Sequence, residues 1–308
     1  MVFGLLLVWA GVSQAQTVTT TTPYGGVESL SVSVSAAQSA TGNAYSYSAI
    51  RINLNAPGLS FKVSPNNGAA ANEVTTQRTS AFVSQENAQI GINTNFFAYN
   101  PTSDFFGPYT TDLNGVSASN GVGVSPFQTG YNNALNLSSS NVGTIIRGGI
   151  NGGYSNTENV SLYNAFSFNN ALLINNGVVN ASLATDAQAR NRFPGIALTS
   201  DQRLVLLGNT SINWKEMAQA MIFVAGGSTG LSGSFLDGGG SAALYLRDPN
   251  TNSVNALVSS SRYNGSSLAI FAATVPEPSS LAMVAIGVAI LLARKHRRVR
   301  IRIERSKL

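Results

Sequence analysis

The stretch Ser234-Phe-Leu-Asp-Gly-Gly-Gly-Ser241 begins inside one segment that has the composition of a β-strand and leads directly into another. The first is Gly233 to Leu236, and the second, Ala242-Ala-Leu-Tyr-Leu246, follows the serine directly. Glycine inside a strand costs backbone entropy and packs no side chain, and three glycines in succession exceed what an ordinary turn needs. Either their backbone N–H groups form an anion-binding nest beside Asp237, or the segment is a bulged or helical turn between strands.

Short apolar runs elsewhere in the chain predict further strands. We expect them at Ala49–Leu54, Leu59–Val63, Gln89–Asn93 and Gly143–Arg147. Residues 171–180 hold two apolar runs around Asn176-Gly177, which is a preferred pair for a type I′ turn, and they predict a β-hairpin.

Two segments favour helices. Apolar side chains recur at helical spacing from Trp214 to Val224, and Asn213 with Glu216 forms a capping-box-like pair at the start. Thr79–Asn87 is expected to be a short second helix. The fold class predicted from these elements is α+β: a single domain of mixed β-sheet with a few helices, large enough for a core of its own.

The composition excludes several classes of active site. The chain has no cysteine, and its only histidine is His296, near the C-terminal end. The region before residue 275 therefore cannot build a Ser-His-Asp triad, a Cys-His pair or a zinc site of His and Cys. Chemistry has to come from carboxylates, arginines, amides, hydroxyls and backbone donors, and the cofactor stays unknown, with a divalent cation at Asp237 left open.

Both ends of the chain have the pattern of targeting segments. Residues 1–10 are almost wholly apolar, and Ser13-Gln-Ala15 supplies a small-x-small cleavage pattern, so residues 1–15 are expected to be a signal peptide rather than a buried strand. Residues 16–45 are expected to be a Thr/Ser-rich leader and residues 46–274 the folded domain. At the other end, Val275-Pro-Glu-Pro278 precedes an uncharged stretch, residues 279–293, and a basic tail from Arg294.

This C-terminal region, residues 275–308, resembles the PEP-CTERM sorting signal. As a helix, residues 279–293 would span only about 22 Å, which is short of a bilayer core of about 30 Å. The resemblance implies an exosortase-type sorting enzyme as a partner, transient anchoring in the inner membrane through residues 279–293, and removal of the tail. It also implies association with exopolysaccharide and a final place at the cell surface, in the extracellular matrix or in the medium.

The basic character of the chain belongs to its tail. Eight of the eighteen Lys and Arg residues lie from Arg294 onward, whereas residues 16–274 hold ten Lys and Arg against eleven Asp and Glu. The domain is therefore near neutral, and nothing in its charge favours nucleic acid as a partner.

Residues 49–246 carry, in order, several elements of one known family. These are Asn93-Thr-Asn-Phe-Phe97, Ser119-Asn-Gly121, a segment from Arg192 to Leu204, a helix with Glu216, and Leu236-Asp-Gly-Gly-Gly-Ser241. In these elements the chain resembles the phosphodiester glycosidase family. The resemblance implies a hydrolase that cleaves a sugar 1-phosphodiester in glycans of the envelope or matrix.

On this resemblance the catalytic residues are Asp237 and Arg192, with Arg190 as the alternative arginine. The substrate-binding residues are then Asn93, Asn95, Gly238, Gly239, Gly240 and Ser241. An arginine gives phosphate two parallel hydrogen bonds, and a departing phosphate monoester is acidic enough to need little help from a general acid. Less specific explanations stand beside these: a turn for the two asparagines, the core for Phe96 and Phe97, and helix capping for Glu216.

Two functions follow from the sequence. The first is an exported phosphodiester glycosidase-like enzyme. The second is a non-catalytic surface or matrix protein that keeps the fold and associates with exopolysaccharide.

Overall fold

The computed structural model describes residues 16–68, 72–98, 106–149, 153–168, 171–185 and 189–275. The expected signal peptide and the sorting segment beyond residue 275 lie outside these residues. The chain divides after Ala273 into two units, and the first unit holds all the strands and helices of the described chain. No helix among the described residues has the length and apolar character needed to cross a membrane.

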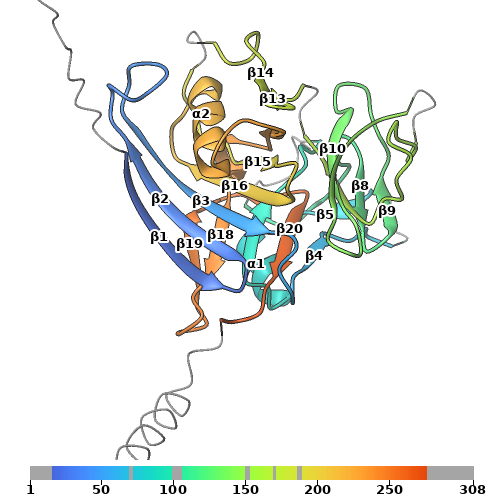
Figure 1. Ribbon diagram of the computed structural model, residues 1–308. Coiled ribbons are helices and arrows are strands. Elements are labelled where there is room, and N and C mark those ends of the chain that lie inside the picture. The colour runs from blue at the N-terminus through green and yellow to red at the C-terminus, as the bar shows by residue number, and fades with distance from the viewer. Residues whose placement is uncertain are drawn as a thin grey trace, which may run out of the picture. The chain divides into compact units, whose positions relative to one another are not determined.

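The largest element is a sheet of eight strands, which we call the large sheet (Figure 1). Its strands, in spatial order, are β1 (Thr17–Tyr24), β2 (Val27–Val34), β3 (Tyr45–Asn53), β16 (Arg203–Asn209), β15 (Gly195–Leu198), β17 (Ser232–Phe235), β13 (Ile174–Asn175) and β14 (Val178–Val179). The long strands β1 to β3 lie side by side and curve together, as Figure 1 shows in blue. The expected Thr/Ser-rich leader therefore includes two paired strands, β1 and β2.

Two further sheets have five strands each. The second sheet runs in the order β19 (Val254–Val258), β18 (Leu244–Arg247), β6 (Ile90–Asn93), β20 (Ser267–Phe271) and β4 (Ser60–Val63). The third sheet runs in the order β11 (Gly143–Arg147), β10 (Asn133–Leu137), β12 (Asn164–Ser167), β8 (Ser117–Ser119) and β9 (Val122–Ser125). A short pair, β5 (Val74–Thr75) and β7 (Thr110–Thr111), completes the strands.

Two α-helices and one 3₁₀ turn are found among the described residues. Helix α1 (Thr79–Gln85) packs on the second sheet, where a side chain at Gly91 of β6 would collide with Val83. Helix α2 (Trp214–Ala225) packs on β3, β15 and β16 of the large sheet. The 3₁₀ turn η1 (Gly239–Ser241) is formed by the glycine run.

The core has two layers because the large sheet is buried on both faces. On one face lies α2, whose Met217, Met221 and Val224 pack against Val205 and Leu207 of β16. The other face packs on the second sheet, in one cluster that includes Ile50, Ile52, Leu204, Leu206, Ile90, Ile92, Leu268 and Ile270. Burial on both faces explains why the central strands are continuous apolar runs instead of alternating ones.

The predicted fold class is wrong in its proportions. The described chain is mostly β-sheet, and its two helices only cover faces of sheets, so the fold is of the all-β kind instead of α+β. The expected mixed sheet is also not found, because every strand pair recorded in the described residues is antiparallel. The expected C-terminal membrane helix falls outside the described residues.

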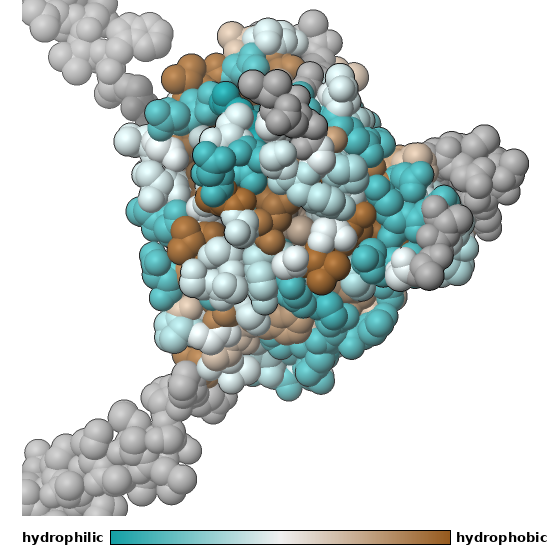
Figure 2. Space-filling view, turned by 90° about the vertical axis from the view of Figure 1, so that its right-hand side faces the viewer, coloured by the Kyte–Doolittle hydropathy of each residue, from teal (hydrophilic) through white to brown (hydrophobic). Residues whose placement is uncertain are grey.

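Local predictions that rested on side-chain chemistry are confirmed. The hairpin of β13 and β14 turns at Asn176 and Gly177, which both have positive φ, 47° and 84°. Asn213 and Glu216 form both hydrogen bonds of a capping box at the start of α2, and the helix ends at Gly226 in the left-handed conformation. On the face shown in Figure 2, hydrophobic residues lie in several separate patches among hydrophilic ones.

Candidate functional site

The glycine run lies where the chain passes from one sheet to another. Strand β17 belongs to the large sheet and β18 to the second sheet, and residues 236–243 connect them. We call these residues the crossover loop. Asp237 stands at its start, directly after the buried Leu236, so its position is set by two sheets at once.

Asn93, at the end of β6, holds both ends of the crossover loop. Its Nδ2 donates a hydrogen bond to the carbonyl of Asp237 (2.7 Å), and its Oδ1 accepts one from the N–H of Ala243 (2.8 Å). The N–H of Asp237 donates to the carbonyl of Thr94 at 3.2 Å. Asn93 is 1% exposed. The structure therefore places this predicted substrate-binding residue under the loop, with both atoms of its amide engaged.

The three glycines allow other parts of the protein to approach the loop closely. A Cβ at Gly238 would stand 2.6 Å from the ring of Phe193, and one at Gly240 would collide with the guanidinium of Arg262. Gly239 has φ of 62° and donates its N–H to the carbonyl of Arg192 at 2.8 Å. The N–H of Ser241 donates to the carbonyl of Gly238 at 3.2 Å. The N–H of Gly239, one of the three glycine N–H groups expected in an anion nest, is thus bonded inside the protein.

The carboxyl group of Asp237 has an unusual electrostatic environment. Burial raises its pKa from 3.8 to about 6, because removal from water disfavours the charged form. Hydrogen bonds with the Ser241 hydroxyl and the Gly238 backbone, together with the positive charge of Arg262, oppose that rise. Near neutral pH the group is mostly ionised, yet it can take up a proton at little cost.

Arg262 is a site residue that the sequence did not predict. It follows β19 in a serine-rich loop with no periodic pattern, and only its charge distinguishes it in the sequence. In the fold, the hydroxyl of Ser260 donates to the carbonyl of Gly240 at 2.8 Å, which fixes this loop against the glycines. Arg262 therefore lies against Gly240 and acts electrostatically on Asp237.

Arg192 lies beside the same loops, but it is connected differently. Its carbonyl accepts the Gly239 N–H, and its Nη2 donates to the carbonyl of Ser259. Its Nε is buried and has no hydrogen-bond partner in the described structure. The alternative arginine, Arg190, forms an ion pair with the fully buried Glu216 (2.5 Å) at the start of α2. Of the two, Arg192 is the one next to the crossover loop.

Asn95 is buried just after the end of β6 and bonds to the chain segment that follows β7. Its Nδ2 donates to the carbonyls of Val116 (3.1 Å) and Asn114 (3.3 Å). Its Oδ1 and the hydroxyl of Thr94 are buried without a hydrogen-bond partner in the described structure. Asn95 therefore connects the end of β6 to the segment that leads into β8 of the third sheet. Its Oδ1 has no hydrogen-bond partner in the described structure.

An aromatic cluster adjoins the crossover loop. Trp214 stacks on Phe235 with ring centroids 4.3 Å apart, and Phe193 contacts both rings. Phe96 lies edge-on to Phe235 and next to Tyr131. Phe235 is buried, whereas the other four are only partly buried. The cluster packs on the core and also keeps apolar ring surface near Asp237, through the contact of Phe193 with Gly238.

The described residues contain no group of three Asp, Glu, His or Cys side chains that could hold a metal ion. A divalent cation at Asp237 stays a prediction, and the carboxylate with the hydroxyl of Ser241 would be its nearest oxygen donors.

A comparison with protein-family models finds a family for the folded region and a motif for the C-terminal segment. The model of the phosphodiester glycosidase family matches residues 86–271, which is more than half of the chain. The model of the PEP-CTERM protein-sorting motif matches residues 274–298. A search of curated protein sequences found no match.

Solved structures share the fold at low sequence identity. A protein from Synechocystis matches with a TM-score of 0.56 and 14% identity, over 84% of this chain and 64% of its own. The catalytic domain of zebrafish N-acetylglucosamine-1-phosphodiester alpha-N-acetylglucosaminidase, auto-inhibited by its pro-peptide, matches with a TM-score of 0.54 and 14% identity, over 83% and 88%. A protein from Burkholderia pseudomallei K96243 that is described as exported matches with a TM-score of 0.52 and 12% identity, over 83% and 96%.

Proposed function

The chain belongs to the phosphodiester glycosidase family, and we propose that it is an exported hydrolase that cleaves a sugar 1-phosphodiester in envelope or matrix glycans. The observation that carries the proposal is the environment of Asp237. Its carboxyl has a pKa near 6 and lies between Arg262, Ser241 and the glycine backbone, in the loop that connects two sheets. Perturbed carboxyls of this kind gather at functional sites.

Asp237 is proposed to act on the attacking water. The oxygen of water attacks the anomeric carbon, and the bond from that carbon to the phosphate oxygen breaks. The electron pair of that bond leaves with the phosphate monoester, and the proton of water passes to the Asp237 carboxylate. Because the leaving group is already acidic, the step requires a base and charge stabilisation more than it requires a general acid.

The two arginines are proposed to bind the phosphate. Arg262 packs on Gly240, and the carbonyl of Arg192 accepts the N–H of Gly239 in the same turn. A guanidinium can give a phosphate two parallel hydrogen bonds, which fixes its orientation. The partly buried rings of Phe96, Phe193 and Tyr131 would then offer apolar surface to the sugar.

A specific observation also favours the non-catalytic alternative. The N–H groups of Gly239 and Ser241 are bonded within the protein, and the guanidinium of Arg192 donates to Ser259. A phosphate at the glycine run would therefore find fewer free N–H donors than the sequence suggested. A surface or matrix protein that keeps the fold and associates with exopolysaccharide would need none of them.

A substrate panel separates the two functions. Purified protein is incubated with a set of sugar 1-phosphodiesters, with and without a chelator, and release of the free sugar is measured. Turnover of at least one substrate that falls by orders of magnitude in Asp237→Asn supports the enzyme. Asp248→Asn is the matched control, since Asp248 caps an exposed turn and asparagine keeps that role.

The opposite results are equally clear. Wild-type turnover in Asp237→Asn would overturn the catalytic role of this residue. No turnover on any substrate, together with binding to native exopolysaccharide, would favour the non-catalytic protein. Loss of activity with the chelator would add a cation to the site.

The PEP-CTERM motif supports export. We propose that an exosortase-type enzyme recognises the motif, that residues 279–293 anchor the chain transiently in the inner membrane, and that the processed protein reaches the cell surface, the matrix or the medium.

A further inference from the structure

A polar cavity opens on the large sheet, at the other end of the strands that carry the candidate site. Its volume is about 480 Å³, and its polar lining includes Thr22, Glu28, Arg51, Asn53, Asp201 and Arg203. Strand β15 separates the two places, because Arg192 precedes it and Asp201 follows it. At about 3.4 Å per residue, the four residues of β15 alone account for roughly 10 Å between them.

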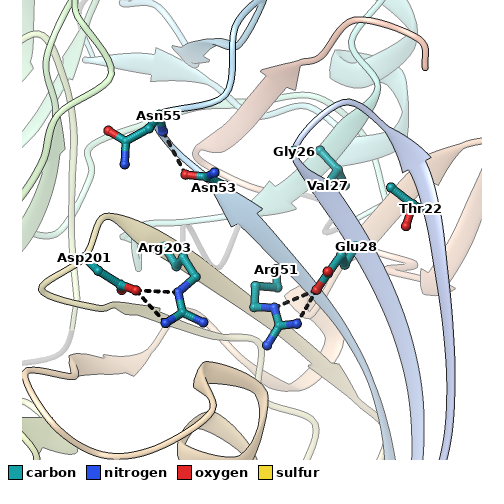
Figure 3. Close-up of a pocket in the computed structure, with 9 residues that line it drawn as sticks. All are labelled: Thr22, Gly26, Val27, Glu28, Arg51, Asn53, Asn55, Asp201 and Arg203. Atoms are coloured by element: carbon teal, nitrogen blue, oxygen red, sulfur yellow. Dashed lines mark hydrogen bonds and ion pairs between the residues drawn. The ribbon is translucent and has the colours of Figure 1, made fainter. Parts of the chain in front are cut away.

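Two ion pairs lie side by side in this cavity (Figure 3). Arg51 pairs with Glu28, its direct cross-strand neighbour, and Arg203 pairs with Asp201 in the turn between β15 and β16. The guanidinium groups lie between their two carboxylate partners in Figure 3. The cavity therefore presents two cations and two anions in one row and has no net charge.

The polar groups are held in place before any ligand arrives. Arg51 also donates from Nη1 to the carbonyl of Val224 (3.0 Å) in the last turn of α2, and Arg203 binds Asp201 through both Nε (2.8 Å) and Nη2 (2.5 Å). Asn53 accepts the N–H of Asn55 at 3.1 Å. Groups that are already ordered lose less conformational entropy when a ligand binds.

We propose that this cavity binds a segment of a neutral oligosaccharide and holds the protein on a glycan away from its candidate catalytic site. Sugar hydroxyls both donate and accept hydrogen bonds, and the cavity offers fixed guanidinium donors, carboxylate acceptors, an amide and a hydroxyl that do both. Its two arginines are already paired, so a phosphate or a uronate would gain little charge attraction there. The proposal does not depend on catalysis and stands equally for a non-catalytic matrix protein.

The test is a titration of the purified protein with defined oligosaccharides, followed by isothermal calorimetry at low and high salt. The neutral probes are hexasaccharides of glucose, mannose and galactose, and the anionic probe is hexagalacturonate. We expect at least one neutral probe to bind with an affinity that high salt leaves unchanged, because no net charge is involved.

Matched variants on one strand locate the site. Thr22→Glu places a longer side chain in the cavity, where it occupies space that a sugar would fill, whereas Thr20→Glu makes the same change on β1 outside the cavity. Both threonines are exposed, so neither change should unfold the protein. We expect Thr22→Glu to weaken binding about tenfold or more, a change of about 1.4 kcal/mol, and Thr20→Glu to leave it unchanged.

Three results would overturn the proposal. One is failure of every neutral probe to bind. Another is binding of hexagalacturonate alone, with loss at high salt, which would mark an anion site. The third is an equal response of Thr22→Glu and Thr20→Glu, which would place the binding elsewhere. Turnover of a small sugar 1-phosphodiester serves as a separate readout, and Thr22→Glu should not change it.

Discussion

At the scale of single residues, Asp237 combines two properties that usually exclude each other. It is largely removed from water, yet Arg262, Ser241 and the Gly238 backbone stabilise its charged form. The net effect is still a raised pKa, so burial outweighs the three favourable contacts. A group in this balance lowers the stability of the fold when it ionises, and such a cost is commonly tolerated at functional sites.

This balance predicts how stability depends on pH. Since the pKa is about 6 in the fold and lower in the unfolded chain, the folded protein binds the proton more tightly. The stabilisation from that proton is present below pH 3.8 and is lost as pH rises through about 6. Asp237→Asn should therefore raise the free energy of unfolding at pH 8, by up to about 3 kcal/mol, and change it little at pH 4. Urea denaturation at both pH values measures this, and an equal effect at the two would contradict it.

A second prediction concerns the arginine whose charge opposes the effect of burial on this pKa. The charge of Arg262 lowers the pKa of Asp237, so Arg262→Gln should raise it above the wild-type value. Arg192→Gln is the matched control, because Arg192 touches the loop through its backbone carbonyl. The titration is followed by ¹³C NMR of the carboxyl carbon. If both variants shift the pKa equally, or neither does, the assignment of Arg262 fails.

The sequence could predict Asp237 but not Arg262, and the reason is physical. Asp237 carries a local signal, since three glycines after a strand are rarely tolerated without cause. Arg262 meets Asp237 only because β19 and the loop after it return to the glycines in space. The serines that precede Arg262 in the sequence form no pattern that indicates this contact. The resemblance of the segment from Arg192 to Leu204 predicts Arg192, although in the structure its guanidinium donates to the carbonyl of Ser259.

At the scale of elements, the crossover loop is held mainly by one side chain beneath it. Asn93 bonds to Asp237 at one end of the loop and to Ala243 at the other. A strand end in one sheet thus fixes the path of the chain between two sheets. An asparagine suits this place, since its amide offers a donor and an acceptor in one plane.

These two hydrogen bonds of Asn93 predict a loss of stability when the amide is removed. Asn93→Ala leaves the buried carbonyl of Asp237 and the N–H of Ala243 without these bonds, and should lower the free energy of unfolding by about 2–4 kcal/mol. Asn55→Ala, at an exposed position, is the control and should change it by less than about 0.5 kcal/mol. Chemical denaturation of both variants measures the difference. A similarly small change in the free energy of unfolding for both variants would show that Asn93 does not hold the crossover loop in place.

Elements with local chemistry could be predicted, and those with distant partners could not. The Asn176-Gly177 turn and the capped helix α2 are encoded within a few residues each, and both are confirmed. The pairing of β2 with β3 depends on residues some twenty positions apart, such as Glu28 and Arg51, so the sequence did not reveal it, although the alternation within β2 is a strand pattern. Both expected helices are found, as α1 and α2, so the fold class was wrong because several strands, among them β1, β2 and most of the third sheet, were not expected.

At the scale of the whole molecule, segments distant in sequence meet at one end of two packed sheets. The end of β6, the segment before β15, the crossover loop and the loop after β19 all contribute to the candidate site. The opposite end of the large sheet holds the neutral cavity. An exported protein with both would hold a glycan at one end and act at the other.

The last prediction concerns the C-terminal segment, which lies outside the described residues. The PEP-CTERM motif matches residues 274–298, and the uncharged stretch within it, at about 22 Å as a helix, is too short for a comfortable permanent anchor. We therefore expect the tail to be removed after export. The intact mass of protein recovered from producing cells should lack the residues that follow the motif. Replacement of Pro276, Glu277 and Pro278 by alanine should block recognition and leave the tail in place, whereas the same number of alanines at Ser259, Ser260 and Ser261 should not. A mature wild-type form that still carries residues 294–308 would show that the motif does not direct processing in this chain.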